Sequence, residues 1–106
     1  MDYTEFTIYY DGLMTMSIHI DEEDRGKGYS RPLMNNVITL LERSYDIRLD
    51  QLVFIDMDFS DGFWDHIGMK MNRYGIDYRG KRDVEGRGYE KYITWTDLKK
   101  WVRKSR

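Results

Sequence analysis

Hydrophobic and polar residues alternate through the first twenty positions of the chain. The apolar members of the alternation are Phe6, Ile8, Tyr10, Met14, Met16, Ile18 and Ile20. A period of two residues is typical of β-strands that have one strongly apolar face, with the second face exposed or covered by a partner. Asp11 and Gly12 separate the two runs, and both residue types tolerate the positive φ of a tight turn. Residues 4–20 are therefore predicted to form an antiparallel hairpin.

The pattern changes to helical spacing over about residues 30–43, which predicts an amphipathic helix whose apolar face consists of Leu33, Val37, Leu40 and Leu41. Pro32 fits the first turn of a helix, and Ser30 is expected to cap it. Residues 52–55 (LVFI) are continuously apolar, which indicates a strand buried on both faces. We expect this strand to pair in parallel with residues 14–20, with the helix as the crossover.

The remainder of the chain predicts a short helix at residues 61–67, strands at about 72–78 and 89–95, and a closing helix. Gly68 is expected to end the short helix, and Thr96 to cap the closing one. The residues of the closing helix that are expected to face the core are Leu98, Trp101 and Val102. We predict an α/β (α+β) fold whose mixed, mostly antiparallel sheet contains one parallel pair, with residues 1–106 as a single domain.

Composition excludes several classes of protein. The chain has 106 residues, 34% charged and 41% hydrophobic, which suits an ordered globular domain. It contains no cysteine, so disulfides, thiolate metal sites and cysteine nucleophiles are excluded. No apolar run approaches the roughly 20 residues of a membrane span, and the N-terminus lacks the pattern of a signal peptide. We therefore expect a cytoplasmic protein that makes no membrane contact.

The net charge of -2 conceals a basic end of the chain. Its cationic residues are Lys99, Lys100, Arg103, Lys104 and Arg106, opposed by Asp97 alone. Cations near a helix C-terminus interact favourably with the helix dipole, so this stretch is more typical of a solvated helix face than of a nucleic-acid interface. Nucleic acid is not expected as a partner.

A glycine-bearing turn joins the hairpin to the long helix, with the sequence Arg25-Gly26-Lys27-Gly28-Tyr29-Ser30. A strand that leads into a helix N-terminus presents backbone N–H groups and the positive end of the helix dipole, which suit a phosphate. The two glycines allow close approach of a ligand, and the two cations add charge. As a bare pattern this also fits an ordinary turn, and the acids at residues 21–24 disfavour an anion unless they point to solvent.

Residues 18–34 resemble the acetyl-CoA-binding motif of the GNAT family of N-acetyltransferases, in which a strand leads into Arg/Gln-x-x-Gly-x-Gly/Ala and a long helix. Residues 62–70 (GFWDHIGMK) resemble the second signature of this family, which places an aromatic residue and a short helical stretch before the next strand. The two matches cover about residues 13–72 in the expected order. The resemblance implies acyl transfer from acetyl-CoA to an amine, which is either a small molecule or a protein lysine or N-terminus.

The resemblance also implies which residues bind coenzyme A. The backbone amides of Arg25, Gly26, Lys27, Gly28, Tyr29 and Ser30 would bind its pyrophosphate. The strand edge around Ile18 and Ile20 would pair with the pantetheine arm, which enters where the two parallel strands splay apart.

The candidate catalytic residues are His19, Glu22 and Trp64. Trp64 stands where many members of the family carry a tyrosine that protonates the departing thiolate, and an indole N–H is not a useful acid. His19 also fits a structural role, and Glu22 also fits a solvated charge. Without a side-chain base, the chemistry would depend on proximity and on a backbone N–H that polarises the thioester.

Other interpretations stay open. The strand and two helices that normally shape the acceptor pocket of the family have no counterpart here, so the resemblance implies a pocket that is open or completed by a second copy in a homodimer. A non-catalytic coenzyme A-binding or protein-interaction module is the main alternative. Residues 52–60 (LVFIDMDFS) also resemble the first motif of haloacid dehalogenase phosphatases, but too few residues follow. No metal is expected, because Ile67 stands where an EF-hand needs its bidentate glutamate.

Overall fold

The fold opens with two antiparallel strands, β1 (Tyr3–Ile8) and β2 (Met14–His19). The computed structural model describes residues 2–9, 13–55, 63–72, 75 and 89–104. The register of the two strands runs from Tyr3 opposite His19 to Ile8 opposite Met14. The predicted hairpin is therefore confirmed, while its turn at Asp11 and Gly12 lies outside the described residues.

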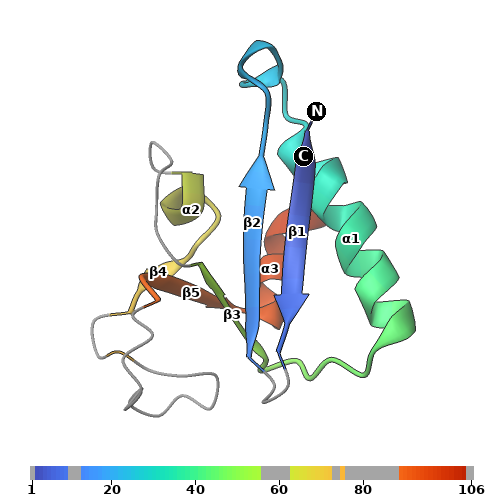
Figure 1. The fold of residues 1–106 in the computed structure, drawn as a ribbon, viewed down its shortest axis with the longest axis vertical. Helices are drawn as coiled ribbons and strands as arrows, with labels where there is room; N and C mark the ends of the chain where they lie inside the picture. The colour runs from blue at the N-terminus through green and yellow to red at the C-terminus, as the bar shows by residue number, and fades with distance from the viewer. Residues whose placement is uncertain (1, 10–12, 56–62, 73–74, 76–88, 105–106) are drawn as a thin grey trace.

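Three further strands complete the described sheet: β3 (Leu52–Ile55), β4 (Lys70–Met71) and β5 (Lys91–Thr94). The strand order is β1-β2-β3-β5-β4 (Figure 1). β2 and β3 run parallel, and the other neighbouring pairs run antiparallel. The mixed, mostly antiparallel sheet with one parallel pair is thus confirmed. β3 lies between β2 and β5, which explains why its last three residues are buried.

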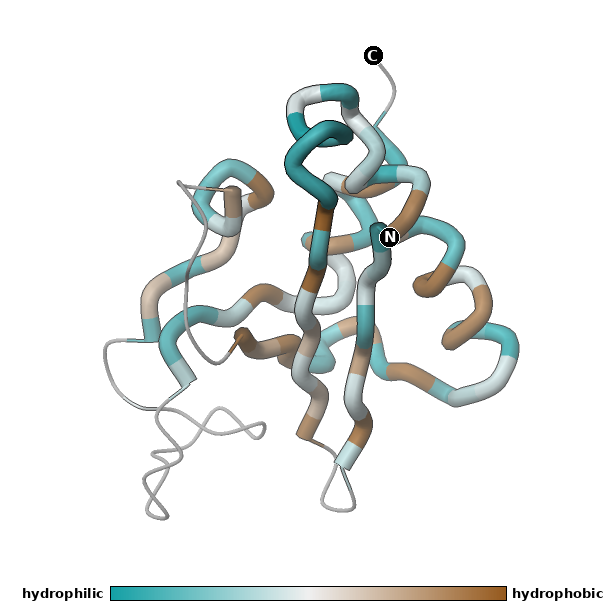
Figure 2. Tube along the Cα trace, turned by 45° about the horizontal axis from the view of Figure 1, so that its top comes forward, coloured by the Kyte–Doolittle hydropathy of each residue, from teal (hydrophilic) through white to brown (hydrophobic). Residues whose placement is uncertain are grey.

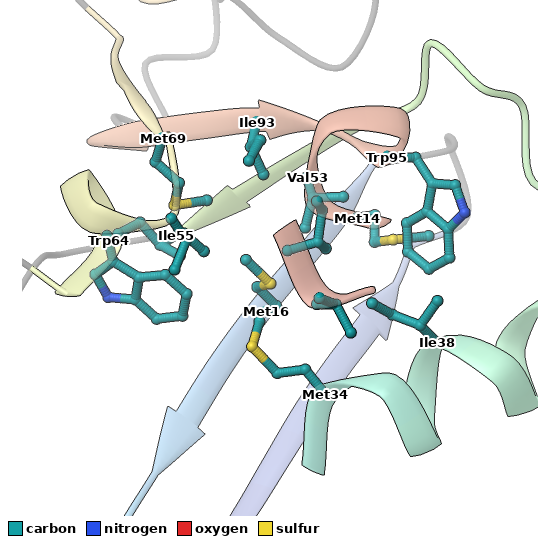
Figure 3. Packing of buried hydrophobic residues seen from close by; sticks show 13 residues of the cluster. Met14, Met16, Met34, Ile38, Val53, Ile55, Trp64, Met69, Ile93 and Trp95 are labelled. Carbon is teal, nitrogen blue, oxygen red and sulfur yellow. The ribbon is translucent and has the colours of Figure 1, made fainter. Parts of the chain in front are cut away.

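Two longer helices cover one face of the sheet: α1 (Ser30–Ser44) and α3 (Trp95–Val102). The short helix α2 (Phe63–His66) contributes Trp64 to the same core. Figure 3 shows Met34 and Ile38 of α1 approaching Met14 and Met16 of β2, with Trp95 beside them. In the described ranges, even the 15-residue α1 lacks the length and apolar character that crossing a bilayer requires.

The buried face of α1 differs from the predicted one. Met34 and Ile38 are fully buried, whereas Leu40 is 63% exposed. Successive helical residues turn by about 100°, so residues 34, 38 and 41 form one stripe and residue 40 points away from it. The leucine and valine pattern correctly predicted a helix but not the side that meets the sheet.

Both predicted helix caps are wrong. Ser30 is the first residue of α1, Tyr29 precedes it, and no side chain caps this end. In α3 the capping side chain is that of Thr94, whose Oγ1 accepts a hydrogen bond from Asp97 N over 3.2 Å. Thr96 instead donates from Oγ1 to the carbonyl oxygen of Leu49 over 2.7 Å. Thr94 is thus both the last residue of β5 and the cap of α3, which begins at the next residue.

The segments between β3 and β5 agree in part with the prediction. The short helix spans Phe63–His66, within the predicted 61–67, and Gly68 follows it with φ of +100°, as expected for a glycine after a helix. β4 begins two residues before the predicted strand at 72–78, most of which lies outside the described residues. Residues 79–88, which join the two predicted strands, lie outside the described part entirely, as do residues 56–60 of the stretch that resembles a phosphatase motif.

Candidate functional site

The glycine turn, defined here as residues 25–30, follows β2 and the short 3-10 helix η1 (Glu22–Asp24). Figure 2 shows a strongly hydrophilic stretch over η1 that continues into the start of the glycine turn. Gly26 has φ of +79° and Gly28 has φ of +77°, a region that residues with a Cβ rarely adopt. A Cβ on Gly26 would meet no atom within 4 Å, so the space beside this residue is open. Glycine is favoured there because of the positive φ and not because of a steric clash.

The turn contains several backbone N–H groups that have no partner among the described residues. Among the described residues, no acceptor pairs with the amide N–H groups of residues 28–31 or of Gly26. By contrast, Arg25 N donates to Glu22 O over 3.3 Å, and Lys27 N donates to Asp24 O over 3.4 Å. The free amides lie at the positive end of the dipole of α1, which further favours negative charge. The turn therefore has the donors that an anion needs.

The two cations of the turn are partly engaged. Arg25 donates from Nε to the carbonyl oxygen of Ile20 over 3.2 Å, which ties the turn to the end of β2. Lys27 Nζ lies 4.0 Å from Asp24 Oδ1, and the Lys27 side chain is 55% exposed. Lys27 can therefore reorient toward a bound anion at little cost, since exposed ion pairs stabilise a fold only weakly.

Three carboxyl groups gather beside the turn, those of Asp2, Asp21 and Asp24, with oxygens within 4.8 Å of one another. Asp2 accepts a hydrogen bond from Asp21 N over 2.7 Å, which joins the start of the chain to the end of β2. Hydrogen bonding with the Asp2 carboxyl raises the pKa of Asp24. The hydrogen bond between Asp21 and Asp2 thus anchors the start of the chain, and the raised pKa lets Asp24 lose its negative charge more readily on acidification.

The parallel strands β2 and β3 pair only briefly. Their register joins Met14 to Val53 and Thr15 to Phe54, after which β3 ends at Ile55 while β2 continues to His19. Among the residues that the structure describes, no strand pairs with residues 16–19 of β2 on this side. Among the described residues, the backbone edge around Ile18, next to the predicted residue Ile20, therefore has no neighbouring strand on this side.

The predicted catalytic residues lie in two places. His19 stacks on Tyr3 with ring centroids 5.4 Å apart, and its Nε2 lies 3.0 Å from Asp21 Oδ1. Glu22 is exposed on η1, close in sequence to this pair. Trp64 is only 5% exposed and packs in the core beside Phe63, with ring centroids 5.0 Å apart. The structure brings His19 and Glu22 to the same end of β2, whereas Trp64 packs on α2 within the core.

A buried cation beside the end of β3 escaped the sequence interpretation. The side chain of Lys91 is 7% exposed, and its Nζ lies 2.8 Å from Asp65 Oδ1. Lys91 pairs with Ile55 across the sheet and links β5 to α2. The signal was present in the sequence, because Lys91 is in phase with Ile93 and period-two alternation directs both to the same face.

A cavity of about 460 Å³ lies on the sheet face opposite the core. Its polar lining consists of Glu5, Thr7, Tyr9, Thr15, Ser17 and Tyr89. Beside it, the buried ring of Phe54 packs against Tyr89 and Tyr92, with centroids 5.4 and 6.1 Å apart. Met16 also borders the cavity, which therefore reaches the point where the pairing of β2 with β3 stops.

Comparisons with models of protein families, with curated proteins and with solved structures find no significant match to this chain. Function is therefore inferred from its own geometry. Among the described residues, three features lie along or next to β2: the amides of the glycine turn that lack an acceptor, the strand edge beyond the pairing with β3, and the cavity on the face away from the helices.

Proposed function

We propose that the chain binds an acyl-coenzyme A at the glycine turn and transfers its acyl group to an amine, as the resemblance to GNAT acetyltransferases implies. The observation that carries this proposal is the row of backbone amides at residues 28–31, which have no acceptor among the described residues. A diphosphate carries several anionic oxygens and matches such a row of donors at a helix N-terminus. Lys27, which is 55% exposed, adds a positive charge that can reach the ligand.

The open edge of β2 supports the same proposal. The pantetheine arm of coenzyme A contains two amide groups, which can bond to a strand edge as a neighbouring strand does. Residues 16–19 of β2 offer such an edge, because the described part of β3 pairs with β2 only as far as Thr15. The glycine turn follows this edge after η1, and we propose that one ligand contacts both.

The chemistry requires that the amine lose a proton. A bound acyl-coenzyme A would supply the thioester, whose C–S bond breaks as the amide C–N bond forms. His19, held by Asp21 at the end of β2, is the side chain that we propose to accept the amine proton, which then passes to solvent or to the departing sulfur. Glu22 would add negative charge that attracts a cationic acceptor. Trp64 would act from the core by supporting α2.

A non-catalytic coenzyme A-binding module is the second candidate. The burial of Trp64 favours it, because this residue stands in the place of a proton-donating tyrosine and leaves that acid role without a side chain. The two candidates share the glycine turn and differ only in turnover.

Thermal unfolding with and without coenzyme A tests the proposal, because a ligand that binds only the folded state raises the unfolding temperature. We expect a rise that saturates with coenzyme A concentration. Acetyl-CoA with spermidine or a lysine peptide should then release free thiol, and His19→Gln should slow that release without changing the thermal shift. Binding without thiol release selects the module. No shift at millimolar coenzyme A overturns both candidates.

A further inference from the structure

Among the described residues, the cavity on the sheet face opposite the core is lined by one charged side chain and several hydroxyl groups. Glu5 stands opposite Ser17 in the register of β1 and β2, and Thr7 stands opposite Thr15. Directly opposed residues in an antiparallel pair lie close enough to share one ligand. All four residues line the cavity, so their polar groups form a compact set on one face.

Two tyrosines extend this set. Tyr9 and Tyr89 border the cavity, where each adds a hydroxyl group and an aromatic ring. The only charged residue among the described lining is Glu5, which is anionic at neutral pH. Aromatic faces and carboxylates both attract cations, whereas an anion would find no positive side chain among the described residues of the lining.

We infer that this cavity binds the primary ammonium group of a small ligand, with the carboxylate of Glu5 as its counter-charge. An ammonium group donates three hydrogen bonds, and the carboxylate together with the hydroxyls of Thr7, Thr15 and Ser17 offers the acceptors. A volume of about 460 Å³ accommodates an alkylamine or the end of a lysine side chain.

The position of the cavity connects this site with the proposed chemistry. Met16 borders the cavity at the point where β3 leaves β2, and the open edge of β2 begins there. An amine held at Glu5 would thus lie beside the strand edge that we propose for the pantetheine arm. In this respect the inference rests on the proposed function, because it makes the bound amine the acyl acceptor. Glu5 is then a positioning residue.

Amide chemical shifts of the full chain, measured by NMR, test the site with n-butylamine as the probe. We expect titration to shift the amides of residues 5, 7, 15 and 17, whereas 1-butanol, which has similar size and no charge, should not. Glu5→Gln should weaken butylamine binding about tenfold, because it removes the only charge in the described lining. Glu23→Gln, which removes an exposed acid outside the cavity, should leave binding unchanged.

Spermidine and a lysine-containing peptide then distinguish a free amine from a protein lysine as the source of the ammonium group. Equal shifts with butylamine and 1-butanol, no shifts at residues 5–17, or equal affinities of the wild type and Glu5→Gln would each overturn the inference. The comparison of n-butylamine with 1-butanol needs only the wild-type chain, so it tests the inference even if Glu5→Gln does not fold. Coenzyme A binding is measured separately. If the chain binds the amine specifically but does not bind coenzyme A, the proposed function is rejected and the inferred amine site is retained.

Discussion

Lys99 on α3 donates a hydrogen bond from Nζ to Oε2 of Glu42 on α1, over 2.7 Å. The same carboxyl group accepts from Arg103 Nη2 over 3.0 Å and from Trp95 Nε1 over 3.4 Å. One side chain of α1 therefore contacts two side chains of α3 and that of the residue that follows it. Because Trp95 begins α3 and Arg103 follows its last residue, Glu42 holds the helix along its whole length.

Replacing Glu42 by glutamine should destabilise the fold. Glutamine keeps one acceptor but loses the charge that pairs with Lys99 and Arg103, and the Glu42 side chain is 29% exposed, so we expect a loss of about 1–2 kcal/mol in the free energy of unfolding. Urea unfolding of Glu42→Gln measures this loss. Glu23→Gln, on an exposed position of η1, provides the control and should change stability by less than about 0.5 kcal/mol. Equal losses in the two variants would show that Glu42 does not join the helices.

The same carboxyl group should make stability depend on acidity. Hydrogen bonding from Lys99, and then from Trp95 and Arg103, lowers the pKa of Glu42 below its ordinary value of 4.5. The folded state therefore binds this proton less readily than the unfolded state, so the stabilisation is complete above about pH 4.5 and is lost as the pH falls through the lower pKa of the folded state. Urea unfolding of the wild type and Glu42→Gln between pH 7 and pH 3 should show a difference that shrinks on acidification. A difference that is constant or grows would exclude this linkage.

The buried face of α1 can be tested with two alanine substitutions in the same helix. Met34 is fully buried beneath the sheet, so Met34→Ala should lower the free energy of unfolding by about 2–5 kcal/mol. Leu40 is 63% exposed, and Leu40→Ala should change the free energy of unfolding by no more than about 0.5 kcal/mol. Chemical denaturation compares the two variants directly. A larger loss of stability for Leu40→Ala than for Met34→Ala would show that the helix packs on the face that the leucine pattern predicted.

The glycine turn offers a matched pair of substitutions for the proposed ligand. Gly26 and Gly75 both have positive φ, and a Cβ on either would meet no atom within 4 Å. Alanine at either position should cost about 1–2 kcal/mol in backbone strain. Only Gly26→Ala alters the turn that leads to the free amides, so we expect it alone to weaken coenzyme A binding, by tenfold or more in a thermal-shift titration. Similar affinities for the two variants would place the ligand elsewhere.

Local patterns in the sequence were sufficient for the elements that depend on them. Alternation predicted β1 and β2, the continuous apolar run predicted the central strand β3, and the spacing of leucines predicted α1. The parallel pairing of β2 with β3 then followed from the helix between them.

Features that depend on contacts between distant segments were not predictable in the same way. Thr94 and Thr96 are both suitable caps, and only the bond from Thr96 to Leu49, 47 residues away, leaves Thr94 to cap α3. The burial of Met34 in place of Leu40 depends on how α1 lies on the sheet. The cavity is lined by Tyr89 together with residues from 5–17. Tyr89 precedes β5, and it reaches this place because β5 lies next to β3 in the sheet. No periodicity within one segment contains that information.

The insertion of β5 between β3 and β4 affects the order of events during synthesis. Ile93 of β5 faces Val53 of β3 across a separation of 40 residues, and in the described sheet β4 pairs with β5 alone. A nascent chain that has not yet exposed Lys91 outside the ribosome has neither this strand nor α3 to cover its apolar face. Until then, β3 presents an unpaired edge that nearby chaperones or other copies of the chain can capture.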